Sequence, residues 1–454
     1  WIRESTYCDA VKSLKNLLVP TPLLGDSSNR AASTAFVAAA VAAATPWLNV
    51  VADYGADPTG VANSTTAIQA AVTAAASGGH VFFPPGTFKV TAQISATIAS
   101  GASINITGSG QGVSKIKCTG CNGFVLTTTN NSSTVNMADL SIITTDNGSF
   151  IAIFIQGAVV SAGGAFNTST FRNIAMHGAD YFTTDINYWA YGMLFQALNF
   201  VMLNNITING PLTSKGNGVS FNGDTTHSEY AVVLSIDACI FDFLATGVLL
   251  GSFWQGVMIS NTNITNCVNG VIIPSGQSGS LVEISIVNSQ MQCSSACVLI
   301  DTAMQDLNIS NCLFLTANGV GANLIYLNAP VQGVTIVGNS LIGENGGLPI
   351  GIGIPTSTGV IVGVISGNTF GYLSNAIYIL AAAHQLTISD NIFFLGTTNY
   401  FVQAAATGVV IDDHNLNTIA SLPGVSAALN GSKFIITNGA APTYHGAVGA
   451  AGAV

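Results

Sequence analysis

The stretch VADYGADPTGVANSTTAIQAAVTAAASGGHVFFPPGTFKV, residues 51–90, places one short amphipathic helix ahead of two strand-like segments. Turn-forming residues crowd its beginning: Asp53, Gly55, Asp57, Pro58 and Gly60. Side-chain oxygens at Asn63 or Ser64 are candidates for the helix N-cap. Apolar residues then recur with the spacing of one helix face, namely Ile68, Ala71, Val72 and Ala75. We predict a helix over Ser64–Ala76 that ends at Gly78 and Gly79, because glycine tolerates the left-handed C-terminal conformation.

The remainder of the stretch predicts β structure. HVFF (80–83) predicts a strand, PPG (84–86) a tight turn and TFKV (87–90) a second strand, so we expect a hairpin-like pair. Strand-like segments without helical periodicity dominate the sequence that follows. The single helix therefore has to be explained by what comes after it.

The composition excludes several classes of protein. Only 30 of the 454 residues are charged and 49 are glycine, which is too little charge for a disordered chain and too much glycine for a helical one. The formal net charge is −10, and the few basic residues after Lys89 are scattered, so no patch could neutralise a row of phosphates. We therefore expect no nucleic-acid partner.

Membrane insertion is not expected either. The mean hydropathy is +0.52, but the run AFVAAAVAAA (35–44) has only ten residues, mostly alanine, and is well short of a membrane span. The opening residues WIRESTYCDAVKSLK lack a long apolar core, so we expect no secretory leader there.

The eight cysteines do not suggest a disulfide framework in a chain of this length. Cys118 and Cys121 have a metal-like spacing, but no second Cys or His pair follows at finger distance. We interpret this pair, and Cys293 with Cys297, as small buried side chains in a protein that folds in a reducing compartment. We expect no metal and no other cofactor.

A short repeat dominates the sequence from Asp139 onward. Each copy is an alternating apolar strand, then Asn or Asp, then an apolar residue three positions on. The copies are DLSI at Asp139, NIAM at Asn173, NITI at Asn205, NTNI at Asn261, NSQM at Asn288, NCLF at Asn311, NSLI at Asn339 and NIFF at Asn391. DACIF at Asp237 and GNTF at Gly367 are variants, and successive copies lie 23 to 34 residues apart.

Repeats of this length indicate a solenoid. The lack of helical patterns between the strands excludes leucine-rich and helical repeats, and the lack of blade motifs disfavours a propeller. We predict an all-β, single-stranded parallel β-helix in which equivalent positions of successive coils stack about 4.8 Å apart. The recurring Asn is expected at a corner, where it bonds along the stack or adopts a left-handed conformation. The lone helix then caps the N-terminal edge of the solenoid, which would otherwise be unpaired.

The stretch DYGADPTGVANSTTAIQAAV…GGHVFFPPGTFKV resembles the opening of the right-handed β-helices of the pectate-lyase superfamily, above all the branch found in phage tailspikes and some polysaccharide-degrading enzymes. Upstream, GDSSNRAASTAFVAAAV (25–41) is similar to a segment of phage tail-fibre proteins. The first match is close over residues 51–90 and then decays to periodicity.

This resemblance implies a homotrimeric spike on a virion tail, made in the bacterial cytoplasm. Its N-terminus would bind other virion tail proteins, and its β-helix would bind, and often cleave, a bacterial surface polysaccharide. We accordingly expect a partly helical connector at 1–49, with a helix at 31–44, and a receptor-binding β-helix at 50–415. The sequence leaves the structure of the Gly/Ala-rich segment 416–454 open.

Glycoside hydrolysis requires two carboxyl groups, about 5 Å apart for retention or about 6.5–9.5 Å apart for inversion. Aligning VEISIVN with QDLNISN on Asn288 and Asn311 puts Glu283 over Asp306, both pointing outward. Carboxylates this close repel each other, so one of them is protonated more readily and suits the role of acid. The alternative is a pair of solvated acids on a β surface.

A second group of acids lies in two longer insertions. NGDTTHSEY (222–230) contains Asp224 and Glu229, the alternative catalytic pair. Acids beside aromatic rings suit a sugar site, because rings stack on sugar faces while carboxylates accept hydroxyl hydrogens. The residues expected to bind substrate are Asp180, Asp185, Tyr188, Trp189 and Trp254. For the aromatic residues, packing in the core or in a trimer interface is the competing interpretation.

Three functions stay open at this stage. One is a spike that depolymerises a host surface polysaccharide, and another is an adhesive spike that binds the glycan without cutting it. A calcium-dependent polysaccharide lyase ranks third, because basic residues in the β-helix are few and scattered and no Asp cluster of calcium type occurs.

Overall fold

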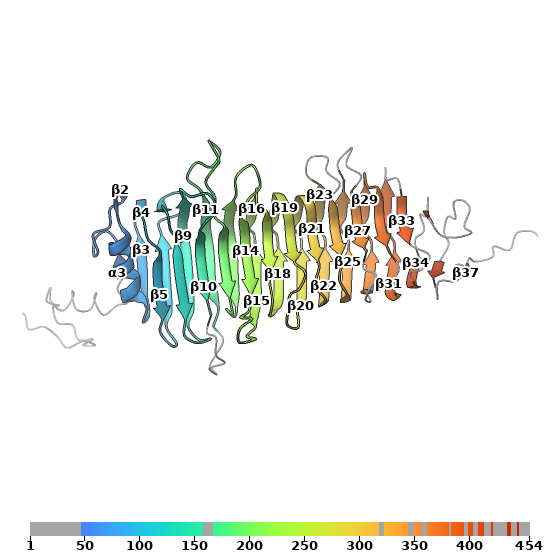
Figure 1. Cartoon of the computed structure of the whole chain (residues 1–454), viewed down its shortest axis with the longest axis horizontal. Coiled ribbons are helices and arrows are strands. Elements are labelled where there is room, and N and C mark those ends of the chain that lie inside the picture. Colours follow the sequence, from blue (N-terminus) through green and yellow to red (C-terminus); the bar gives the residue numbers. More distant parts are fainter. Residues whose placement is uncertain are drawn as a thin grey trace, which may run out of the picture. The chain divides into compact units, whose positions relative to one another are not determined.

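The computed structural model describes residues 47–412 except 158–166, 317–321, 344–348, 356–360, 381–382, 395–397 and 403–406, together with 419–420, 434–436 and 443–444. The chain divides into two units, Trp1–Leu48 and Asn49–Val454. The described residues of the second unit form a right-handed parallel β-helix with a single α-helix at its N-terminal end (Figure 1). The fold class predicted from the repeat is confirmed. The helix expected at 31–44 and most of 416–454 lie outside the described residues.

Three parallel ladders form the walls of the solenoid, and most coils contribute one strand to each. After β1 (Trp47–Asn49), the first ladder comprises β3 (Gly79–Phe83), β6 (Ser103–Gly108), the first parts of β9 (Thr134–Thr144), β11 (Ser169–Gly178) and β13 (Val201–Asn209), then β15 (Ala231–Asp237), β18 (Trp254–Ser260), β20 (Val282–Val287), β22 (Met304–Ser310), β25 (Val331–Val337), β28 (Ile361–Ser366), β31 (Ala383–Ser389) and β34 (Thr407–Asp412).

The second and third ladders continue each coil around the core. The second comprises β2 (Thr59–Asn63), β4 (Gly86–Val90), β7 (Ser114–Cys118), the later parts of β9, β11 and β13, then β16 (Ile240–Asp242), the first parts of β19 (Asn263–Ile273) and β21 (Gln290–Ile300), β23 (Leu313–Thr316), β26 (Ser340–Ile342), β29 (Thr369–Gly371) and β32 (Ile392–Phe394). The third comprises β5 (Ile94–Ile98), β8 (Phe124–Thr128), β10 (Ile151–Gln156), β12 (Tyr191–Gln196), β14 (Asn217–Asn222), β17 (Thr246–Leu250), the later parts of β19 and β21, β24 (Asn323–Leu327), β27 (Ile350–Ile354), β30 (Asn375–Ile379), β33 (Thr398–Val402) and β35 (Ile419–Ala420).

The core is a continuous apolar column between the three ladders. Alternate residues of each strand point inward, as in β7, where Ser114, Ile116 and Cys118 are fully buried between two half-exposed lysines. The column includes a series of buried phenylalanines: Phe83, Phe88, Phe124, Phe171, Phe195, Phe221, Phe241, Phe314 and Phe370. The seven described cysteines are buried and free, which confirms their interpretation as small core residues. Within the described ranges no helix is long and apolar enough to span a membrane.

The helix α3 (Thr65–Ala75) caps the first coil, as predicted. Its buried face is Ile68, Ala71, Val72 and Ala75. The side chain of Gln69 pairs with the open edge of β5, since its Nε2 donates to the Ser95 carbonyl at 2.7 Å and its Oε1 accepts from the Ser95 amide at 2.9 Å. The helix therefore supplies hydrogen-bond partners to the strand edge that the solenoid leaves unpaired.

One local prediction in this region holds in part and another is wrong. Ser64 occupies the N-cap position, as one alternative predicted, but its hydroxyl accepts from the Asp57 amide at 2.9 Å instead of capping the helix. Asn63, the other candidate, accepts from the Thr65 amide through Oδ1 at 3.1 Å. The strands β3 and β4 do not form a hairpin, because β3 pairs with β6 and β4 pairs with β7 in the next coil. The PPG segment is a corner between two ladders rather than a reversal of the chain.

The recurring Asn forms the corner between the first and second ladders. Residues there have a positive φ, including Asp139 (60°), Asn173 (52°), Asn205 (52°), Asn261 (50°), Asn288 (50°) and Asn311 (55°). Side chains also bond along the stack, since Asn173 Nδ2 donates to Asp139 Oδ1 at 2.8 Å and Asn205 Nδ2 to Asn173 Oδ1 at 2.6 Å. Both roles expected of this residue are confirmed.

In later coils the stacked Asn side chains point into the core. Gly338 and Gly367 take the left-handed corner, and the following Asn339 and Asn368 are buried. Asn368 Oδ1 accepts from the Asn339 amide at 3.0 Å and from Asn339 Nδ2 at 2.9 Å, while its own Nδ2 donates to the Ile336 carbonyl at 2.9 Å. Each buried amide thus satisfies backbone groups of the neighbouring coils.

Replacing Asn368 with Ala should lower the free energy of unfolding by about 3 kcal/mol, because it leaves buried backbone and side-chain groups without partners. Urea unfolding followed by circular dichroism measures this change. Asn328→Ala is the matched control, since the Asn328 side chain is exposed and donates to Asp301 Oδ1 at the surface. Equal losses for the two variants would show that the inward ladder contributes no more than a surface hydrogen bond.

Candidate functional site

Glu283 and Asp306 lie side by side on the outer face of the first ladder. β20 pairs with β22 in the register Ile284 to Leu307 and Ile286 to Ile309, and these four side chains are fully buried. Glu283 and Asp306 occupy equivalent positions between the matched pairs Val282–Gln305 and Ile284–Leu307, and both are exposed. The alignment that predicted one acid over the other in successive coils is confirmed, and the role of the two acids stays a prediction.

Both acids occupy a bend in the strand. Glu283 has a φ of 66° and Asp306 a φ of 57°, and the equivalent residues of the coils before and after are Gly256 (74°) and Gly333 (78°). Earlier in the same row, Val233 also has a positive φ (62°), so the bend is a property of this wall. The bend sets the direction in which the Glu283 and Asp306 side chains leave their strands.

The two acids line a surface hollow of about 390 Å³ together with Ser285, Asn308, Gly333 and Thr335. We call these six residues the acid hollow. Gly333 makes room for the Asp306 carboxylate, since a Cβ atom at position 333 would collide with Asp306 Oδ1. A smaller hollow of about 160 Å³ adjoins it and includes Gln305 and Gln332.

The neutral lining of the acid hollow was not predicted. Hydroxyl and amide groups such as those of Ser285, Asn308 and Thr335 both donate and accept hydrogen bonds, as sugar hydroxyls require. The sequence alignment of the coils could have indicated these residues, because they occupy matching outward positions of three successive coils.

The alternative pair, Asp224 and Glu229, belongs to a tight loop. The backbone amide and carbonyl of each bond to those of the other, at 2.8 and 3.1 Å. The Asp224 side chain is buried and accepts from the Thr226 amide at 2.7 Å and from His227 Nδ1 at 3.1 Å. The hydrogen bond from His227 lowers the pKa of Asp224 despite the opposing effect of burial. A carboxylate committed to its own loop is a poor general acid.

Asp180 and Asp185 organise the loop after β11. Partial burial alone would raise the pKa of Asp180, but hydrogen bonds from Thr184, Ile186 and Asn187 outweigh it and lower that pKa to about 2. Asp185 accepts a hydrogen bond from the Leu212 amide and so joins this loop to the next insertion. Both acids therefore have structural partners at positions where the sequence predicted sugar contacts.

Of the three aromatic residues predicted to bind a sugar, two are buried instead. Trp189 is 3% exposed and donates from Nε1 to the Ile142 carbonyl, while Trp254 is fully buried and donates to the Gly251 carbonyl at 3.0 Å. Their rings pack in the core and offer no face to a sugar. Tyr188 is half-buried, its ring lies against Gly148, and Lys215 Nζ lies 5.9 Å from the ring centroid.

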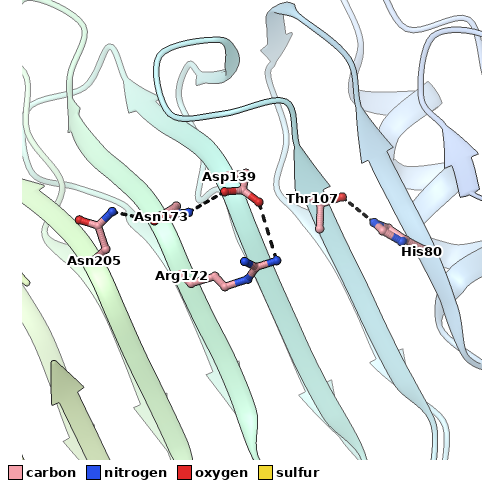
Figure 2. A network of polar contacts seen from close by, with 6 residues as sticks. All are labelled: His80, Thr107, Asp139, Arg172, Asn173 and Asn205. Atoms are coloured by element: carbon pink, nitrogen blue, oxygen red, sulfur yellow. Dashed lines mark hydrogen bonds and ion pairs between the residues drawn. The ribbon is translucent and has the colours of Figure 1, made fainter. Parts of the chain in front are cut away.

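A polar network marks the N-terminal part of the same outer face. Figure 2 shows Arg172 reaching from β11 toward Asp139, with Asn173 and Asn205 continuing the corner ladder. On the neighbouring strands β3 and β6, His80 Nε2 bonds to Thr107 Oγ1, and burial lowers the pKa of His80. No motif in the sequence singles out Arg172. No group of three or more His, Cys, Asp or Glu side chains suited to a metal ion occurs among the residues that the structure describes.

Comparison with known proteins finds one family model that matches part of the chain. Residues 47–272 match the model of a family described as rhamnogalacturonase A/epimerase, pectate lyase-like. No curated protein matches.

Solved structures similar to the chain include PfbA, a surface adhesin of Streptococcus pneumoniae, at 13% identity over 89% of this chain and 99% of that one (TM-score 0.49). They also include the catalytic unit of the GH87 alpha-1,3-glucanase of Streptomyces thermodiastaticus, at 14% identity over 84% and 71% of the two chains (0.47). A third is ORF18 of Geobacillus virus E2, at 16% identity over 90% and 68% (0.40). Identities this low convey nothing about activity. Over residues 47–272, the β-helix carries the sequence features of the rhamnogalacturonase A/epimerase, pectate lyase-like family.

Proposed function

We propose that this protein is a tailspike that depolymerises a bacterial surface polysaccharide by glycoside hydrolysis at the acid hollow. The observation that carries the proposal is the stacking of Glu283 over Asp306 on an exposed wall. Backbones of adjacent parallel strands lie about 4.8 Å apart. This spacing suits a retaining hydrolase, whose two carboxyl groups are about 5–5.5 Å apart.

In the proposed reaction the two carboxyl groups have different roles. One, protonated, donates its proton to the glycosidic oxygen as the bond to the sugar breaks. The other, ionised, attacks the anomeric carbon to form a glycosyl-enzyme, and water activated by the first group then releases the sugar. The hydroxyl and amide groups of Ser285, Asn308 and Thr335 hold the sugar hydroxyls during both steps.

One feature supports hydrolysis over lyase chemistry. Proton abstraction from a uronate is helped by a basic residue, and the residues lining the acid hollow include no Lys, Arg or His.

We propose that the spike is a homotrimer attached to the virion tail through its N-terminal region. Support comes from the tail-fibre-like segment at 25–41 and from large apolar side chains exposed on the walls of the solenoid. These include Ile240 and Ile392 of the second ladder, which are 43% and 57% exposed. Burial between subunits would remove this apolar surface from water.

A non-catalytic adhesin is the second candidate function. The observation in its favour is an apolar surface on the insertions rather than on the wall, made by Phe182, Ile186 and Leu212, which are 56–66% exposed. Such side chains bind a ligand without performing chemistry on it.

Glu283→Gln and Asp306→Asn should each reduce the release of reducing ends from the host polysaccharide by at least about a thousandfold. Binding should change little, because the acids act mainly in the transition state. Reducing-end assays and glycan-array binding measure the two effects. Asp301→Asn is the matched control, since this acid lies outside the acid hollow and pairs with Asn328. Hydrolysis at the parent rate by both variants would refute the proposed pair, and a parent protein that binds but never cleaves would favour the adhesin.

Gly333→Ala should also impair hydrolysis, because the new Cβ collides with the Asp306 carboxylate and displaces it. Gly256→Ala is its control: it has the same left-handed backbone strain, but its Cβ meets Val233 only at an ordinary contact distance of 3.5 Å. We expect similar losses of stability, about 1 kcal/mol each, with a loss of activity for Gly333→Ala alone. Equal activities of the two variants would show that the position of the Asp306 side chain is unimportant.

A further inference from the structure

We propose that the hollow beside Arg172 is a second carbohydrate site, which binds the carboxylate of an acidic sugar residue. This hollow has a volume of about 260 Å³ and lies on the outer face of the first ladder. Its lining includes Asn105, Thr107, Asn136, Ala138, Thr170 and Arg172. We call it the arginine hollow.

The register of the ladder opens a space in front of Arg172. Thr107, Ala138 and Arg172 are matched residues of β6, β9 and β11 in one row, in which Thr107 is half-buried, Ala138 is 4% exposed and Arg172 is exposed. Ala138, the small middle residue, lines the hollow, and Figure 2 shows the Arg172 side chain extending over β9. The guanidinium therefore borders the hollow instead of standing straight out from the wall.

The Arg172 guanidinium contributes little to the stability of the fold. Its only ion pair among the described residues joins Nη2 to Asp139 Oδ2 at 3.9 Å, and the Arg172 side chain is 62% exposed. An exposed pair of this kind contributes about 0–1 kcal/mol to stability. The other oxygen of Asp139 accepts from Asn173, so Asp139 is held by the corner ladder without Arg172. The planar fork of N–H donors is thus available for a carboxylate, which it fits in bidentate geometry.

The neighbouring groups suit the rest of a sugar ring. Asn136 is fixed within the wall, because its Oδ1 accepts from the Thr170 amide and hydroxyl at 3.0 and 2.8 Å. Its Nδ2 donates to Ser103 Oγ at 3.0 Å and to Asn105 Oδ1 at 3.3 Å, which orients the Asn105 amide group. One cation among neutral amides and hydroxyls matches a ligand with one carboxylate and several hydroxyls, as in a uronate residue.

The arginine hollow and the acid hollow share one row of the wall. The row passes from Thr170 through Met202, Ser235 and Met258 to Ser285, each matched to the next in adjacent strands. Four inter-strand steps of about 4.8 Å separate the two hollows by about 19 Å. Met202 and Met258 are 50% and 41% exposed and offer apolar contact to sugar faces between them. A single glycan chain lying along this row would reach both sites; this link rests on the proposed function, whereas carboxylate binding at Arg172 does not.

Saturation-transfer NMR with glucuronate and glucose as probes tests the site on the full-length protein. We expect saturation of glucuronate but not of glucose, a loss of about tenfold or more in apparent affinity for Arg172→Gln, and a smaller loss for Arg172→Lys, which keeps the charge but not the fork. Lys115→Gln is the matched control, because it removes one positive charge from the second ladder and should leave glucuronate binding unchanged. Glu283→Gln should also bind glucuronate like the parent, which separates this site from the proposed catalysis.

Two results would overturn the proposal. One is glucuronate binding to Arg172→Gln with the affinity of the parent. The other is the absence of saturation transfer to glucuronate from a parent protein whose folding has been verified by circular dichroism.

Discussion

The interaction on which this structure depends is the hydrogen-bonded stacking of parallel strands at a fixed spacing. Each residue of a coil meets its counterpart in the next coil, as Ile284 meets Leu307, so the register of one pair propagates along the wall. Left-handed corners keep that register, because residues such as Asn173 and Asn288 turn the chain at the same place in every coil. The neighbours of a side chain on the outer face therefore come from other coils, many residues away in the sequence.

The same constraint explains where functional groups can lie. Outward side chains form rows along the axis, and acids one coil apart lie on strands whose backbones are about 4.8 Å apart, which is the basis of the proposed hydrolysis. The bend at Glu283 and Asp306, together with the missing side chain at Gly333, directs one carboxylate into an open space. At the ends of the solenoid the terminal strands have no further coil to pair with. Gln69 of α3 bonds to β5 at one end, and β36 (Phe434–Ile436) pairs antiparallel with β34 at the other, followed by β37 (Thr443–Tyr444).

The parts of the fold that repeat were predictable from the sequence, and those that occur once were not. The Asn corners supply an alignment of coils, and this alignment alone is enough to place Glu283 over Asp306. The PPG segment was misjudged because a tight turn between strands looks the same at a corner and in a hairpin. Trp189 was placed on the surface because it lies beside an irregular insertion, where no repeat indicates which side chains point inward. Trp254 was placed there because it is the first residue of β18, where the alternation of the strand has not yet begun. The arginine hollow could not be predicted, because its lining residues come from three strands. No motif around Ala138 or Asn105 indicates that these strands lie side by side.

The central claim is that Glu283 and Asp306 act together as one catalytic unit because the register stacks them. The most direct test compares the rate of polysaccharide cleavage by Glu283→Gln, by Asp306→Asn and by the double variant. If the two acids act in the same step as a unit, the double variant should be about as slow as the slower single variant. Once one acid has been removed, removing the other should lower the rate of cleavage little further. Losses that multiply in the double variant would show two independent contributions and contradict the account, as would a double variant that still cleaves the polysaccharide at the parent rate.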